Sequence, residues 1–64
     1  MKVGSVLECN GNIYLVKEIH ECGRVVANLC GRDGQELFVV PGMNIYINSS
    51  NLDEYKVIGE AEVA

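Results

Sequence analysis

Turn signals divide this sequence into short runs, and they restrict its fold more than any other feature. Asn10-Gly11 is the clearest signal, because a two-residue hairpin turn of type I′ needs a positive φ at both central positions. Further signals stand at Cys22-Gly23, at residues 31–34 and at Pro41-Gly42. A chain punctuated in this way predicts short strands that return beside one another as an antiparallel meander.

The runs between the turns have the composition of strands. They are rich in β-branched and aromatic residues, and none repeats its apolar residues with the 3.6-residue period of a helix. The expected strands cover residues 5–9, 13–21, 24–30, 36–40 and 43–48. After them, residues 49–54 place N-cap residues ahead of two acids and predict a single helical turn. Residues 55–58 predict a closing strand, and residues 59–64 a tail that frays.

The length and composition predict one small all-β domain over residues 1–64. The chain is 48% hydrophobic and 22% charged, which is typical of globular proteins and excludes a disordered chain. A five- or six-stranded meander of this size cannot expose long apolar edges and stay soluble, so we expect closure into a small antiparallel barrel. The expected core consists of Val6, Leu15, Val26, Leu29, Leu37, Val39, Ile45 and Ile47.

Residues 13–21 depart from simple alternation. Tyr14, Val16 and Glu18 share one face of this expected strand, while Leu15, Lys17 and other residues share the opposite one. Because neither face is purely apolar, the pattern predicts a strand that bends partway along its length.

The first quarter of the sequence resembles a known class of barrel. Residues 4–18, GSVLECNGNIYLVKE, contain a strand, a Gly-containing turn and an aromatic-x-Val strand. They are similar to the opening of SH3-like barrels of the KOW type, as in the N-terminal domain of translation elongation factor P. The helical turn around Leu52, placed before the last strand, is also similar to that topology. The resemblance implies an SH3-like barrel of five to six strands.

The sequence departs from that family in its loops and its charge. The elongation factor domain carries a modifiable basic residue in a loop, within a basic surface that faces RNA. Here the loop tips are Cys22-Gly23 and Arg32-Asp33, and the net charge is −4. The resemblance therefore implies the fold and not a role in translation.

The charge distribution favours a protein partner. Residues 33–64 carry one lysine and six acids, a net charge of −5. SH3-like barrels bind extended peptides in aromatic-lined grooves or at a sheet edge. We therefore expect a non-enzymatic adaptor or accessory protein with a basic protein partner, bound through Tyr46, Asp53, Glu54 and Tyr55. The alternative interpretation is that the tyrosines cover one end of the barrel and the acids are simply solvated.

Two other functions stay open. A KOW-like module would bind nucleic acid through Tyr14, Lys17 and Arg24, although a net charge of −4 weakens attraction to phosphate. A self-assembling homo-oligomer would pair an edge strand of residues 43–48 with a second copy. Both alternatives use the same expected fold.

Cysteine and histidine residues raise the question of a metal or a nucleophile. Cys9, His20, Cys22 and Cys30 are the right residue types for zinc, but only His20 and Cys22 have a spacing close to that of a ligand pair. Nothing near His20 and Cys22 supplies an oxyanion hole or an orienting group. We therefore expect structural thiols, no cofactor, no metal, no catalytic residue and no enzymatic activity.

The same cysteines bear on location. Three is an odd number for a disulfide framework, and the first residues, Met1-Lys2-Val3-Gly4, lack the apolar run of a signal peptide. No apolar run approaches the roughly 20 residues that span a bilayer. These features predict a cytoplasmic protein with reduced thiols and no membrane association.

Overall fold

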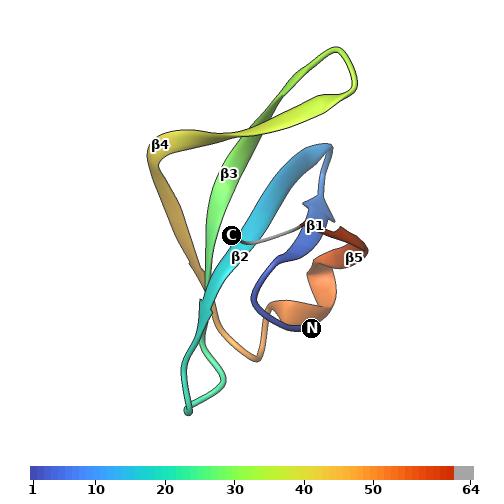
Figure 1. Cartoon of the computed structure of the whole chain (residues 1–64). Helices are drawn as coiled ribbons and strands as arrows, with labels where there is room; N and C mark the ends of the chain where they lie inside the picture. The colour runs from blue at the N-terminus through green and yellow to red at the C-terminus, as the bar shows by residue number, and fades with distance from the viewer. Residues whose placement is uncertain (62–64) are drawn as a thin grey trace.

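A computed structural model describes residues 1–61 of the chain. Five antiparallel strands form one sheet in the order β4-β3-β2-β1-β5 (Figure 1). The strands are β1 (Ser5–Cys9), β2 (Asn12–Ile19), β3 (Val25–Asp33), β4 (Glu36–Ile47) and β5 (Lys56–Glu60). A 3₁₀ turn, η1 (Leu52–Glu54), precedes β5. The prediction of an all-β antiparallel fold with one short helical turn before the last strand is confirmed.

The sheet is not closed, so the expectation of a sealed barrel is wrong. β4 and β5 lie at opposite ends of the strand order and do not pair with each other. The apolar face is covered in a different way, because Leu52 of η1 and Tyr55 pack against the core cluster. Side chains between β4 and β5 thus cover the apolar face of the sheet, which the sequence analysis expected barrel closure to cover.

Residues 59–61, which the sequence analysis assigns to the tail, lie beside β1 in the sheet. Gly59 and Glu60 belong to β5, and the backbone N–H of Ala61 donates to the carbonyl of Gly4 at 2.7 Å. The remaining residues of the expected tail, 62–64, lie outside the described residues. No helix in the described part of the chain is long and apolar enough to cross a membrane.

A bulge in β2 explains its mixed pattern. Val16 pairs with Ala27 and Glu18 pairs with Val26, so Lys17 is an extra residue opposite neighbouring residues of β3. Regular alternation would bury Glu18 on the same face as Val16. The bulge turns the strand locally, and both Lys17 and Glu18 are exposed.

β4 passes through Pro41-Gly42 as one strand, where the sequence predicted a turn between two strands. Its pairing with β3 jumps from Asn28↔Asn44 to Cys30↔Val39, so residues 40–43 lie opposite Leu29 alone. Gly42 has a φ of +77°, which permits the bend visible in Figure 1. The proline and glycine therefore bend the strand without reversing the chain.

The buried side chain of Asn28 holds this bend. Its Nδ2 donates to the carbonyl of Val40 at 2.7 Å and to the carbonyl of Leu29 at 2.9 Å. Asn28 is 2% exposed, so these hydrogen bonds form with little competition from water. One amide thereby satisfies a carbonyl on each strand where the regular ladder is interrupted.

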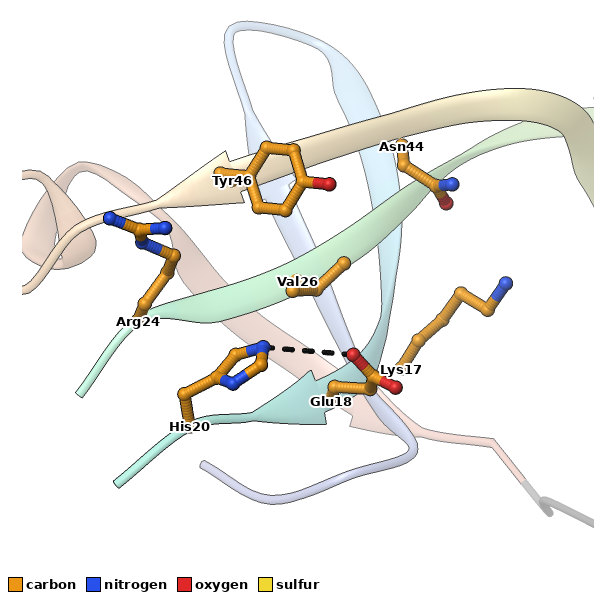
Figure 2. A pocket seen from close by; sticks show the side chains of 7 residues that line it. All are labelled: Lys17, Glu18, His20, Arg24, Val26, Asn44 and Tyr46. Carbon is orange, nitrogen blue, oxygen red and sulfur yellow. Dashed lines mark ion pairs between the residues drawn. The ribbon is translucent and has the colours of Figure 1, made fainter. Parts of the chain in front are cut away.

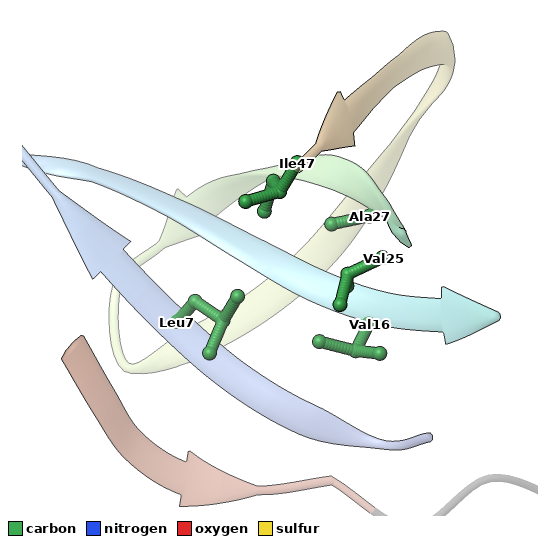
Figure 3. Packing of buried hydrophobic residues seen from close by; sticks show 5 residues of the cluster. All are labelled: Leu7, Val16, Val25, Ala27 and Ile47. Carbon is green, nitrogen blue, oxygen red and sulfur yellow. The ribbon is translucent and has the colours of Figure 1, made fainter. Parts of the chain in front are cut away.

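The core lies on one face of the sheet, over β1, β2, β3 and the last part of β4 (Figure 3). The buried hydrophobic residues are Val6, Leu7, Val16, Val25, Val26, Ala27 and Ile47. Of the expected core, Val6, Val26 and Ile47 are buried, and Leu15, Leu29 and Ile45 are half-buried. Leu37 and Val39 are each 41% exposed, so their assignment to the core is wrong.

The bend in β4 is the reason for those two exposed residues. β2 pairs with β3 only as far as Ile13↔Cys30, so the β3–β4 hairpin continues past the rest of the sheet. We call this two-stranded projection, together with Val39 and Val40 up to the bend, the arm (residues 31–40; Figure 1). Within it, Gly31 pairs with Phe38, and a Cβ on Gly31 would lie 2.3 Å from the tip of the Phe38 ring. The glycine thus leaves room for the ring.

Removing the Asn28 amide should destabilise the fold. In Asn28→Ala, two partly buried carbonyls lose their donor, and we expect the free energy of unfolding to fall by about 1–3 kcal/mol. Urea unfolding followed by circular dichroism measures this change. The matched control is Asn44→Ala, an exposed residue that pairs with Asn28 across the strands and should change stability by less than about 0.5 kcal/mol. Equal losses in the two variants would contradict the role assigned to Asn28.

Candidate functional site

A hollow of about 420 Å³ lies on the face of the sheet that points away from the core (Figure 2). The face follows from alternation, since Val26 and Tyr46 point opposite to their neighbours Val25 and Ile47 in the core. We call it the Tyr46 hollow. It is lined by Lys17, Glu18, His20, Arg24, Val26, Asn44 and Tyr46.

β3 and β4 build the floor and one wall of the hollow. Val26 is buried and pairs directly with Tyr46, which is 68% exposed. Asn44, two residues earlier on β4, points to the same face. An apolar floor, an accessible aromatic ring and an amide therefore stand together on two hydrogen-bonded strands.

The β2 bulge supplies the charged wall. Because of it, the consecutive residues Lys17 and Glu18 both reach the hollow. The Oε2 of Glu18 lies 3.6 Å from the Nε2 of His20, and both side chains are largely exposed. At the surface such a contact orients the two groups and contributes little to stability.

The β2–β3 turn places Arg24 beside this wall. The N–H of His20 donates to the carbonyl of Arg24 at 2.8 Å, and the N–H of Gly23 donates to the carbonyl of His20 at 2.9 Å. Gly23 has a φ of +91°, which the turn requires. The closed turn holds His20 and Arg24 at one end of the hollow, with Lys17 at the other end (Figure 2).

The lining combines charged, apolar and aromatic side chains. Among the described lining residues, Lys17 and Arg24 carry two positive charges and Glu18 carries one negative charge. The hollow is therefore locally positive in a chain of net charge −4. A carboxylate or phosphate is attracted to such a site, and an apolar or aromatic group fits Val26 and Tyr46. No serine, threonine or cysteine is among the residues that line it.

The structure separates the residues predicted for protein binding. Tyr46 lies in the hollow, whereas Asp53 and Glu54 are exposed on η1. Tyr55 is half-buried against the core, on the face opposite to Tyr46. The four residues therefore do not form one surface.

The residues predicted for nucleic-acid binding are also divided. Lys17 and Arg24 share the hollow, but Tyr14 packs against the core, with its ring 5.8 Å from that of Tyr55 in an edge-to-face contact. Tyr46 is the aromatic residue that accompanies the two cations. Glu18, His20, Val26 and Asn44 also line the hollow. Of these, only Asn44 has a usable signal in the sequence, because it alternates with Ile45 and so shares a strand face with Tyr46.

The cysteines do not gather into a site. Cys9 and Cys30 are half-buried and Cys22 is exposed, and all three are free thiols. Within residues 1–61, no three or more His, Cys, Asp or Glu side chains come together as a group that could hold a metal ion.

Burial raises the pKa of two groups near the core. Partial burial raises the pKa of Tyr55 above 10.0, and the neighbouring Cys9, Tyr14 and Glu54 add to the shift when charged. Burial also raises the pKa of the Cys30 thiol above 9.0, against an opposing backbone hydrogen bond from Leu15. In both groups the folded state disfavours the ionised form.

These shifts predict a loss of stability in alkaline solution. Since both folded pKa values are raised, the unfolded chain ionises first, so stability is complete below about pH 9 and falls as pH rises through the folded values. Urea unfolding between about pH 8 and about pH 11 should record that decline. Stability plotted against pH should fall less steeply in the upper part of this range in Tyr55→Phe, and less steeply in the lower part in Cys30→Ala. An unchanged pH dependence in both variants would contradict the assignment.

The comparisons with known proteins identify no relative. The sequence matches no protein-family model, and no curated protein and no solved structure matches the chain.

Proposed function

We propose that this chain is a non-enzymatic adaptor or accessory protein, and that its Tyr46 hollow binds an extended segment of another protein. One observation carries the proposal: Tyr46 is 68% exposed and stands over the apolar floor of Val26, between Lys17 and Arg24. An exposed aromatic ring over an apolar floor is the kind of surface that binds extended peptides.

The other parts of the hollow support a peptide ligand. Its volume, about 420 Å³, accommodates one or two side chains, and pockets of roughly 300–1,000 Å³ are usual for small ligands. Asn44 offers an amide that both donates and accepts, which is what a peptide backbone needs. Val26 and Tyr46 would take an apolar side chain of the same segment.

The charges suggest a partner with two kinds of surface. Lys17 and Arg24 favour an acidic side chain at the hollow itself. The net charge of −4, with Asp53 and Glu54 exposed on η1, favours a partner that is basic overall and approaches through long-range attraction. We therefore propose a basic protein that presents an acidic residue to the hollow.

The wider setting is part of the same proposal. Three free thiols suit a reducing compartment, and we propose a cytoplasmic location. The strand order and the 3₁₀ turn before the last strand are compatible with an SH3-like fold, which is the class we propose for this domain.

A second candidate function is binding of single-stranded nucleic acid. The observation that favours it is the presence of Lys17, Arg24 and the exposed Tyr46 in one hollow. A base would stack on the tyrosine while the cations contact phosphates. Glu18 in the same hollow and the net charge of −4 oppose it, so we place it second.

The test is capture of partners by the tagged 64-residue chain from lysate, with and without nuclease. We expect a defined protein that survives nuclease treatment. Tyr46→Ala and Lys17→Ala should each weaken its binding, the tyrosine variant by about tenfold or more, because a central aromatic residue often dominates an interface. The matched control is Lys56→Ala, a change at an exposed lysine of β5 that should leave the affinity unchanged.

The outcomes separate the candidates. Capture that disappears with nuclease would transfer the proposal to nucleic acid. A protein retained equally by the Tyr46 and Lys17 variants would exclude the hollow as its site. Reversing the charges of Asp53 and Glu54 should slow association with the protein partner, and an unchanged rate would contradict the proposed basic character.

A further inference from the structure

The outer side of β4 is an open sheet edge. Within residues 1–61, β4 pairs with β3 alone, so its second row of backbone N–H and C=O groups has no strand beside it. Such a row is a template for another strand.

Three consecutive apolar side chains are exposed on this edge. Leu37 is 41%, Phe38 51% and Val39 41% exposed. Successive residues of a strand point to opposite faces, so apolar surface is present on both sides of the strand. Protein edges are usually protected by lysine or by inward charges, but residues 36–40 contain only one charge, Glu36 at their start. The other edge, β5, carries Lys56 and Glu60.

The ends of this segment limit how another strand can pair with it. Gly34, with a φ of +63°, forms the turn before the segment, and Pro41 and Gly42 bend the chain after it. Pro41 also lacks an N–H to donate. Residues 36–40 are therefore the straight part of the edge outside the bend, and Phe38 is their midpoint.

The sequence of the segment is complementary to itself. In an antiparallel pairing centred on Phe38, Leu37 lies opposite Val39, and Glu36 lies opposite Val40. The pairs of Phe38 with Phe38 and of Leu37 with Val39 are then entirely apolar, and the pair of Glu36 with Val40 contains one charge. No like charges face each other. The two Glu36 carboxylates lie at opposite ends of the paired segment.

We propose that residues 36–40 pair in antiparallel fashion with the same residues of a second copy, forming a two-fold symmetric dimer centred on Phe38. The two five-stranded sheets become continuous, and Leu37, Phe38 and Val39 gain apolar neighbours on both faces. A symmetric contact of this kind closes on itself and does not propagate.

This assignment differs from the expected pairing through residues 43–48. In that part of β4, Ile45 and Ile47 already face the core, and Asn44 and Tyr46 line the hollow. In the arm, Leu37, Phe38 and Val39 border a small apolar hollow of about 80 Å³, and 41–51% of the surface of each residue stays exposed. The dimer and the Tyr46 hollow use different residues, so each proposal stands or fails alone.

Sedimentation equilibrium on the full chain, from about 1 µM to about 1 mM, tests the dimer. We expect a reversible monomer–dimer equilibrium that tightens as salt is added, because each copy has a net charge of −4 and salt screens their repulsion. Dimerisation that weakens as salt is added would instead indicate a contact between opposite charges, and would contradict the apolar contact proposed here. A monomer at every concentration would overturn the proposal.

Variants locate the contact. Leu37→Lys and Val39→Lys each place a charge on the paired edge and should weaken dimerisation by more than tenfold. The matched control is Val57→Lys on β5, where the replaced side chain is 47% exposed, and it should dimerise as before. Tyr46→Ala should also dimerise as before. Circular dichroism shows whether each variant is folded. If one of the two arm variants fails to fold, the other still tests the contact.

Two further results would contradict this contact. Dissociation caused by Val57→Lys but not by the arm variants would place the interface on β5. Dissociation caused by Tyr46→Ala would place it in the hollow. Amide hydrogen exchange adds a readout of the backbone: protection in residues 36–40 should rise with protein concentration, and a dimer that leaves those amides unprotected would exclude strand pairing.

Discussion

The side-chain amide of Asn28 bonds to the carbonyls of Leu29 and Val40 where the β3–β4 ladder is interrupted. Without these donors, two carbonyls would lie in a partly buried place with no strand partner. The bend that they stabilise divides β4 into two parts with different surroundings. The part after the bend contributes Ile45 and Ile47 to the core, and the part before it forms one strand of the arm.

The candidate site depends on a second irregularity, the bulge at Lys17. Straight strands would place Glu18 toward the core beside Val16, where an unpaired carboxylate is costly. The extra residue instead directs two charged side chains toward the Tyr46 hollow. Both the bend and the bulge use residues that interrupt regular pairing, so the surfaces proposed for binding arise where the sheet departs from its repeat.

Residues with strict backbone requirements made parts of the fold predictable. Asn10 and Gly11 have φ values of +53° and +84°, as a type I′ turn demands, and β1 has the predicted bounds Ser5–Cys9. Pro41-Gly42 misled the prediction because those residues suit a bend within a strand as well as a turn.

The candidate site was less predictable than the strands. Alternation along residues 43–48 separates Tyr46 from Ile45 and Ile47, but alternation cannot tell that Tyr14 faces the core or that Lys17 is a bulge residue. Those facts depend on which strands pair and on the cover given by Tyr55 and Leu52, and such long-range contacts leave no local pattern. The sheet is a single layer, in which Val25 belongs to the core on one face and Val26 lines the hollow on the other. A ligand in the hollow would therefore cover the second side of β3 and complete a layer that this small domain lacks.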